Sequence, residues 1–390
     1  MTRLTVHEYA AGLRPRYRTA TKGVKKGILN EFCQTTGMHR KAAIRLLHRP
    51  TRPAPLHRRG RPRRYGPEVA QALVKLWEVG DRMCGKLLAA VMPDLLGALE
   101  RHGEMEVSPE VRELLLTVSP STIDRLLRGQ HLPRLRQPRR QSPATTTLKS
   151  QIPIRTWSEW KGAQPGSLQA DLVLHCGESL ESFFLTTLCT VDVALGWTEL
   201  QPVWGVGQQR VGGAIHDIRR RLPFPLRALH TDNGSEFINH TLHSWCQRQG
   251  VRFTRGRGYR KNDQAYVEQK NWLSVRRQVG YDRYSSQKAF ELLHQLYPLL
   301  NLQNNFFRPV RKLVGKERLG SKVVKRYDEP QTPYQRLLAA GVLSEPARVA
   351  LEKRFLALNP AQLQRRIDQL LRQLWESAER PTTRAVKRVG

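Results

Sequence analysis

Three acidic residues lie at positions where the surrounding sequence predicts strands or a helix. Asp171 precedes the apolar run 172–174, and Asp232 follows the mostly apolar run 226–231. Glu268 lies inside a segment with a helical pattern. Sixty residues separate the first two acids and thirty-five separate the last two. Two acids on strands and one on a helix can converge at one edge of a sheet and hold divalent metal, so these residues are the candidate site.

The net charge of the chain points to a polyanionic partner. It is +33, from 66 Lys and Arg against 33 Asp and Glu. Such an excess attracts nucleic acid. No apolar stretch approaches the roughly 18 residues that span a bilayer, and the first residues lack the apolar core of a signal peptide. We therefore expect a cytoplasmic protein that handles nucleic acid and has no membrane partner.

Residues 167–305 have the pattern of an α/β domain. Strands are expected first, followed by alternating helices and strands, which predicts a mixed five-stranded sheet. The isolated cysteines form no Cys-x-x-Cys pair, so the pattern favours neither a disulfide framework nor a zinc finger. The predicted strands are 168–174, 183–191, 196–203, 228–231 and 251–254, and the predicted helices are 208–222, 236–248 and 263–278.

Residues 1–50 predict a small helical DNA-binding domain. Helices are expected at 22–33 and 39–48, with Gly37 as the turn or C-cap residue between them. This is the layout of a helix-turn-helix, and the first 65 residues hold 17 Lys or Arg against two acids. A helical hairpin with a solvated basic face is the alternative. The side chains expected to face the major groove are Arg40, Lys41 and Arg45.

Residues 51–66 predict an extended basic linker, because proline and charge prevent a core. The segment 59–62, Arg-Gly-Arg-Pro, resembles an AT-hook, whose arginines lie in a narrow minor groove. Sequence-independent phosphate contact is the alternative. The candidate DNA contacts here are Arg59, Arg61 and Arg63.

Residues 67–130 predict a second helical domain. Ser108 and Ser119 each precede a proline, as an N-cap precedes the first helical residue. A second helix-turn-helix contacting DNA through Arg125 and Arg128 is one interpretation, and a structural bundle is the other.

The remaining segments are basic. A basic linker is expected at 131–166, and a basic, partly helical C-terminal region at 306–390. Within the latter, one helix is expected to be packed through residues at a/d spacing, which are Leu363, Ile367, Leu370 and Leu374.

Two strings carry a resemblance to a known family. Residues 230–237, His-Thr-Asp-Asn-Gly-Ser-Glu-Phe, resemble the second-acid motif of DDE transposases and integrases. Residues 264–268 resemble the entry to that family's catalytic helix, and the 35-residue spacing is its signature. The resemblance covers residues 167–305 and implies an RNase H-like core in which Asp171, Asp232 and Glu268 are catalytic. The flanking organisation resembles bacterial insertion-sequence transposases.

The resemblance implies metal-dependent cleavage and joining of double-stranded DNA. Two Mg²⁺ ions, for which Mn²⁺ can substitute, would be bridged by Asp171, with Asp232 on one and Glu268 on the other. The DNA partners would be the element's terminal inverted repeats and target DNA. Because two ends must be processed together, a homodimer or larger oligomer on DNA is expected, associated with the bacterial nucleoid.

The loop 255–262 is rich in glycine and basic residues, which suits a grip on phosphates; a mobile surface loop is the alternative. Many relatives carry Lys or Arg seven residues after the catalytic Glu, but Val275 occupies that position here. The candidate DNA contacts of this region are Arg255, Arg257, Arg260, Lys261, Lys270, Arg276 and Arg277.

Three neighbouring acids have local explanations. Asp192 is expected at a hairpin turn, Glu236 at the start of a helix and Asp263 as an N-cap. Two other functions stay open. One is a catalytically silent DNA-binding regulator derived from a transposase, and the other is an RNase H-fold nuclease acting on RNA–DNA hybrids or junctions.

Overall fold

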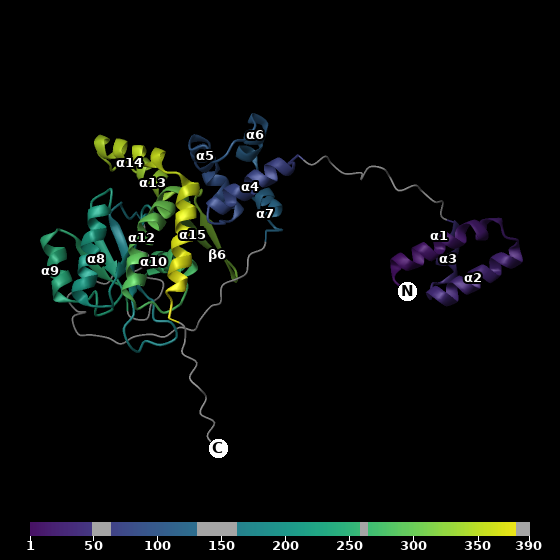
Figure 1. The fold of residues 1–390 in the computed structure, drawn as a ribbon, viewed down its shortest axis with the longest axis horizontal. Coiled ribbons are helices and arrows are strands. Elements are labelled where there is room, and N and C mark those ends of the chain that lie inside the picture. The colour runs from purple at the N-terminus through teal and green to yellow at the C-terminus, as the bar shows by residue number, and fades with distance from the viewer. Residues whose placement is uncertain (49–63, 131–161, 258–263, 380–390) are drawn as a thin grey trace, which may run out of the picture. The chain divides into compact units, whose positions relative to one another are not determined.

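The computed structural model describes residues 1–48, 64–130, 162–257 and 264–379, which form two compact units, 1–64 and 65–390 (Figure 1). Each unit is described here by itself. The AT-hook-like segment and most of the two predicted linkers lie outside the described residues. None of the described helices is both long and apolar enough to cross a membrane.

The N-terminal unit consists of three helices within residues 1–48. They are α1 (Arg3–Thr19), α2 (Lys22–Thr36) and α3 (Arg40–His48), packed around Phe32 and Leu47. The sequence prediction missed α1. Gly37 has φ 70° and its N–H donates to the Cys33 carbonyl, so the predicted C-cap is confirmed. DNA binding by this unit stays a prediction.

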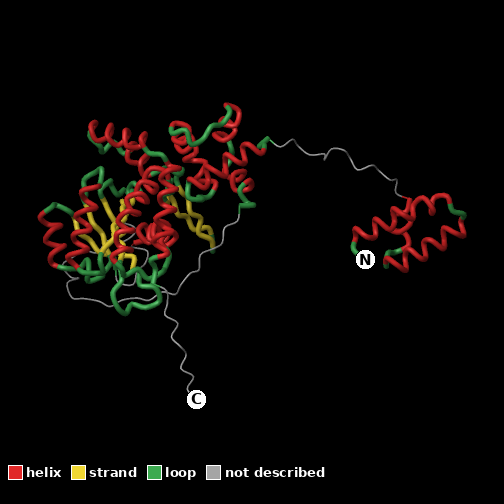
Figure 2. The backbone as a smooth tube through the Cα atoms, viewed as in Figure 1, coloured by secondary structure: helices red, strands yellow, loops and turns green. Residues whose placement is uncertain are grey.

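A mixed five-stranded sheet forms the centre of the second unit (Figure 2). Its order is β3-β2-β1-β4-β5, with antiparallel pairing among the first three strands and parallel pairing of β4 with β1 and β5. This confirms the predicted α/β class and is compatible with an RNase H-like core. The strands are β1 (Ser167–Leu174), β2 (Thr186–Asp192), β3 (Thr198–Val203), β4 (Ala228–Thr231) and β5 (Arg252–Arg255), so β2 and β3 begin later than predicted.

Alternate residues of β1 face different helices. Leu168 and Ala170 join a core with α8 (Gln208–Arg221) and α9 (His240–Arg248). Val173 joins the core on the other face, with the helical run after Gln264 and with α12 (Gln287–Leu302). Because side chains alternate along a strand, Asp171 faces the same side as Val173.

The helix that carries Glu268 changes its winding. It consists of α10 (Ala265–Lys270), a π-helical segment η4 (Asn271–Arg276) and α11 (Arg277–Val279). The sequence predicted one regular helix over 263–278. Short π-helical segments often occur at functional sites, and this one begins three residues after Glu268.

The helical region before the sheet packs as part of the second unit. Ser108 and Ser119 accept hydrogen bonds from the amides of Val111 and Thr122, which confirms both predicted N-caps. Its apolar core is continuous with that of α12 and the C-terminal helices. The helices are α4 (Pro67–Val79), α5 (Gly85–Arg101), α6 (Pro109–Thr117) and α7 (Pro120–Leu126).

The C-terminal region contains a hairpin that the sequence did not predict, formed by β6 (Leu313–Leu319) and β7 (Lys322–Tyr327). A second π-helical segment, η5 (Gln303–Phe307), precedes it. The helices α13 (Pro333–Ala339), α14 (Glu345–Ala357) and α15 (Pro360–Glu376) follow it. The predicted packed helix is confirmed, because the a/d residues of α15 are buried.

Candidate active site

The strand register places the first two acids side by side. In the parallel pair, Gln169 of β1 lies opposite His230 of β4. Asp171 lies two residues further along β1, and Asp232 lies two residues beyond His230, just after the end of β4, so both acids lie at the same end of two adjacent strands that are roughly 5 Å apart. Asp171 shares its face of β1 with Val173, so its carboxylate faces the helical run that carries Glu268, and Asp232 lies close enough to raise the pKa of Asp171.

Two hydrogen bonds hold that helical run against β1. The Gln169 side chain accepts from the Val267 amide at 3.2 Å, next to Glu268. The Asn271 side-chain amide donates to Asp171 Oδ2 at 2.7 Å. Glu268 and Asn271 are three residues apart and therefore lie on one helical face, so this face is fixed toward Asp171. The sequence interpretation missed Gln169 and Asn271, although Asn271 lies one helical turn beyond the predicted acid.

Asp232 and Glu268 act electrostatically on Asp171. Protein atoms that displace water around Asp171 raise its carboxyl pKa, and the negative charges of Asp232 and then Glu268 add to the effect, giving a pKa of about 7. Hydrogen bonds from the Leu172 amide and Asn271 oppose this shift. All three residues keep part of their surface exposed. Negative charge is therefore concentrated at a place that a ligand can reach.

The loop after β4 is shaped by Asp232 and its neighbours. Asp232 Oδ1 accepts from the Gly234 amide at 2.9 Å, a local turn typical of Asp. The Asn233 side chain donates to the Gly256 carbonyl at 2.9 Å and accepts from Arg255 at 3.0 Å. The loops that follow β4 and β5 are thereby tied together beside the acids.

The donor chemistry of this region fits a hard divalent cation. Its carboxylate oxygens are the ligands that Mg²⁺ prefers, and Asn271 Oδ1 is a buried acceptor without a hydrogen-bond partner. A cation would also relieve the repulsion among the three acids. In the described residues, no group of three or more His, Cys, Asp or Glu side chains is arranged closely enough to hold a metal ion. Holding a metal would therefore require the acid side chains to draw closer together.

Comparison with known proteins identifies a relative but no activity. No family model matches the chain. The uncharacterized protein y4rM of Sinorhizobium fredii (strain NBRC 101917 / NGR234) is 44% identical over 329 residues, which is 84% of this chain and 94% of y4rM. The chain belongs to the y4rM family.

A solved structure resembles part of this y4rM-family chain. The catalytic core domain of BIV integrase covers 45% of this chain and 96% of its own, with 19% identity and a TM-score of 0.30. A TM-score of this size supports no inference about activity. The candidate site therefore rests on the contacts and charges of its own residues.

Two neighbouring acids occupy other positions. Asp192 lies at the end of β2 and accepts from the Gly166 and Leu195 amides at 2.7 Å each, so the predicted local bonding is confirmed. Burial nevertheless raises the Asp192 pKa to about 7. The predicted helix-start position of Glu236 is wrong, because Asn239 caps α9 and the helix begins at His240. The third acid, Asp263, lies outside the described residues.

Most of the predicted DNA contacts that the structure describes lie on the surface. Arg255 is partly exposed and bonded to Asn233, whereas Arg260 and Lys261 lie outside the described residues. DNA contact by any of them stays a prediction. The exposed candidates are Arg40, Lys41, Arg45, Arg125, Arg128 and Arg257.

Three further candidates are engaged with the protein itself. Lys270 is only 4% exposed, and loss of water lowers its pKa to about 8. Arg276 donates to the Leu174 carbonyl at 2.8 Å. Arg277 lies 3.2 Å from the Asp81 carboxylate, in the turn between α4 and α5. DNA contact by these residues also stays a prediction. Their charged groups are buried or bonded to other parts of the protein.

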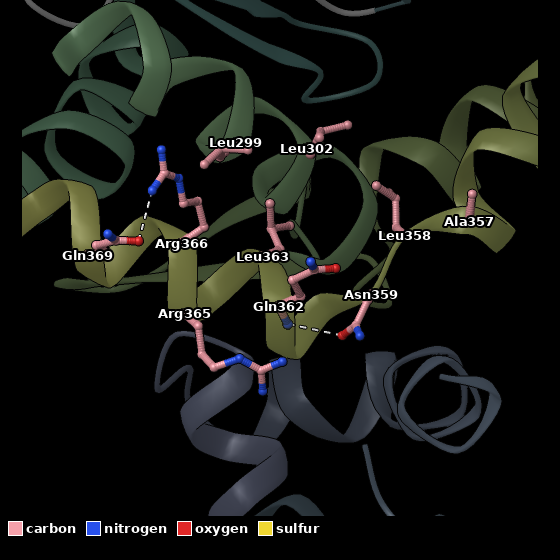
Figure 3. Close-up of a pocket in the computed structure, with 10 residues that line it drawn as sticks. All are labelled: Leu299, Leu302, Ala357, Leu358, Asn359, Gln362, Leu363, Arg365, Arg366 and Gln369. Atoms are coloured by element: carbon pink, nitrogen blue, oxygen red, sulfur yellow. Dashed lines mark hydrogen bonds between the residues drawn. The ribbon is translucent and has the colours of Figure 1, made fainter. Parts of the chain in front are cut away.

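A groove of about 490 Å³ lies between α12, α14 and α15 and contains none of the three acids (Figure 3). Arg365 and Arg366 point away from one another there (Figure 3). Arg365 forms an ion pair with Glu104 at 2.6 Å. The groove is lined by apolar, amide and arginine side chains, so it offers no carboxylate chemistry.

Proposed function

We propose that this protein is a DNA transposase of DDE type that cuts and joins DNA with the help of divalent metal. The observation that carries the proposal is the position of Asp171: its carboxylate accepts a hydrogen bond from Asn271, one helical turn beyond Glu268, and its pKa is raised by the surrounding protein, by Asp232 and by Glu268. A strongly raised pKa caused by burial and by neighbouring acids, at a place that solvent reaches, is typical of functional sites and supports binding of a cation there.

Asp171, Asp232 and Glu268 are proposed to hold two Mg²⁺ ions, for which Mn²⁺ can substitute. Bound metal of this kind supplies positive charge near the attacking and leaving oxygens of a phosphodiester. Asn271 orients the Asp171 carboxylate through its hydrogen bond. Gln169 positions the first turn of α10, so the site is set by groups outside the triad as well.

The proposed reaction has two steps, and in each of them an oxygen nucleophile attacks a phosphodiester bond. Water attacks at the end of the element, which leaves a free 3′-OH and a 5′-phosphate on the flanking DNA. The 3′-OH then attacks a phosphodiester of target DNA, and the target's own 3′-oxygen leaves. The number of phosphodiester bonds is conserved in this second step, so no nucleotide cofactor is required.

DNA binding is proposed to involve both helical regions and the loops beside the acids. The N-terminal unit, proposed as a helix-turn-helix, presents Arg40, Lys41 and Arg45 on α3. Arg255 and Arg257 lie in the segment that Asn233 ties to the Asp232 loop. These regions would bind the terminal inverted repeats and target DNA, with two or more copies of the chain acting on two ends.

The test uses duplexes that carry the inverted repeats flanking the gene. Wild-type protein with Mg²⁺ is expected to nick these duplexes and join them to a plasmid, whereas Asp232→Asn is expected to do neither. Glu199→Gln is the matched control, because Glu199 is a buried acid of β3 outside the site. Equal joining by wild type and Asp232→Asn would falsify the proposal.

The two other functions give different outcomes in the same assay. A silent regulator would retain the end duplex but would not nick it in Mg²⁺ or Mn²⁺. A nuclease would hydrolyse phosphodiester bonds and never join ends to the plasmid. Either outcome would replace the transposase proposal.

A further inference from the structure

The hairpin of β6 and β7 stands apart from the five-stranded sheet (Figure 2). All six residues of β7 are exposed, and so are five of the seven residues of β6. Val314 is 67% exposed and Leu319 is 58% exposed, although both are apolar. An isolated two-stranded hairpin is only marginally stable in water, so this one gains from a partner that covers it.

The strand register separates the charges of the hairpin onto two faces. Lys316 lies opposite Lys325, and Arg318 lies opposite Val323. These four residues share one face, which we call the basic face, because partners in an antiparallel pair point to the same side. It carries three cations and no acid.

The other face of the hairpin is closer to neutral. Glu317 lies opposite Val324 on that side, together with Lys322 and Arg326. Its carboxylate is 3.4 Å from the Arg326 guanidinium. The single acid of β6 and β7 is thus paired on this face and contributes no hydrogen bond or ion pair to the basic face.

The positive charges of the basic face repel one another. Like charges directly opposite one another in an antiparallel pair are destabilising, and Lys316 and Lys325 form such a pair. Tyr327 lies on the same face at the root of the hairpin, where the Arg311 guanidinium stacks over its ring at 4.9 Å. The positive surface therefore continues to the base of the hairpin. An external polyanion would remove the repulsion.

We propose that the basic face binds the phosphates of duplex DNA, a surface additional to those assigned above. This proposal rests on the proposed function, because it assumes that DNA is the polyanion. A two-stranded β-ribbon fits the major groove, with its basic side chains contacting the flanking phosphates. The segment 313–327 contains no Asn or Gln, the side chains that read adenine, and its cations suit the phosphate contacts proposed here. A second copy of the chain fits poorly, because it would bring like charges together.

The test compares two double variants that remove the same charge. Lys316→Gln with Lys325→Gln alters the basic face, and Lys322→Gln with Arg326→Gln alters the other face. Dissociation constants for a fluorescent duplex of about 30 base pairs, enough for several phosphate contacts, are measured by anisotropy over a series of salt concentrations without metal. Melting temperature checks folding, and removal of the Lys316–Lys325 repulsion is not expected to lower it.

The basic-face variant is expected to weaken binding about tenfold and to reduce the slope of log Kd against log salt by about 2, since each phosphate contact contributes roughly 0.9. The other variant is expected to change Kd less than about twofold, since it removes no phosphate contact. Equal effects of the two variants, or an unchanged slope, would overturn the proposal.

Two further outcomes separate this proposal from others. If only the basic-face variant changes the mass of the DNA-free protein in light scattering, the face is a contact between copies and the DNA proposal is wrong. If wild-type protein joins end DNA but the basic-face variant keeps the wild-type salt slope, only the hairpin proposal fails. If wild-type protein binds no DNA at all, the proposed function fails with it.

Discussion

Two carboxylates of the same sheet, Glu199 and Asp171, have opposite surroundings. Glu199 on β3 is buried and lies 3.3 Å from the Arg221 guanidinium. It also accepts hydrogen bonds from Trp197 and Asn301 at 3.0 Å each. The negative charge of Glu199 is therefore balanced by an arginine, and its carboxylate oxygens accept hydrogen bonds from other side chains of the protein.

Asp171 on β1 has no such balance. It accepts hydrogen bonds from the Leu172 amide and from the Asn271 side chain, both neutral. The groups that raise its pKa, besides the surrounding protein, are two further acids. Lack of water raises the pKa of both Glu199 and Asp171, so burial alone does not distinguish them. The difference lies in the charged neighbours: Glu199 has Arg221 as an ion-pair partner, whereas the charges that act most strongly on Asp171 are two further acids, with Arg276 as a weaker positive neighbour.

The largest effect is expected for Glu268→Gln. This change keeps the size of the side chain and removes one charge from the acid cluster. Metal charge stabilisation contributes several kcal/mol, so cleavage is expected to fall about 10³-fold. The melting temperature should stay the same or rise, because repulsion is removed. The measurement is the rate of end nicking in Mg²⁺ together with a thermal melt.

Glu199→Gln is expected to have the opposite effects from Glu268→Gln, on stability rather than on activity. It leaves Arg221 without its carboxylate partner, so a stability loss of about 1–3 kcal/mol is expected without loss of activity per folded molecule. If Glu199→Gln abolished nicking and Glu268→Gln did not, the assignment of the two acids would have to be exchanged.

A smaller effect is expected for Asn271→Ala. Asn271 bonds Asp171, and loss of such an orienting group typically costs about 10–100-fold in metal affinity. The Mg²⁺ concentration for half-maximal nicking should rise, and excess Mg²⁺ should restore most of the rate. The matched control is Asn301→Ala, which removes a similar amide from Glu199. It should lower the melting temperature and leave the Mg²⁺ dependence unchanged.

Local patterns were sufficient to propose the three acids, whose catalytic role stays a prediction, but not to predict the residues around them. Asp171 and Asp232 interrupt or end apolar strands, and such an interruption is visible in the sequence. Asn271 carries no pattern of its own, and its position depends on the π-helical segment that starts there. The ion pair of Arg277 with Asp81 joins residues 196 positions apart, which no local periodicity reveals.

The β6–β7 hairpin was missed for a different reason. Hydrophobic alternation reports burial of one face, and neither face of this hairpin is buried. The available signal was the two-residue turn Gly320-Ser321, in which Gly320 has φ 61°. For strands that are exposed on both faces, the residues of the turn are a better predictor than hydrophobic periodicity.

The smallest effect concerns the pH dependence of stability without metal. The folded pKa of Asp171 is about 7, above its ordinary value of 3.8, so the folded protein holds an extra proton between these two pH values. The contribution of protonated Asp171 to the free energy of unfolding is therefore fully present below pH 4 and is lost as the pH rises through 7. Asp171→Asn should therefore stabilise the protein more at pH 8 than at pH 5 in EDTA, by about 1–2 kcal/mol. Saturating Mg²⁺ at pH 8 should raise the melting temperature of wild type and of Glu199→Gln but not of Asp171→Asn. A Mg²⁺ effect that survived Asp171→Asn would place the cation elsewhere, and the contrast between the two carboxylates would then lose its functional meaning.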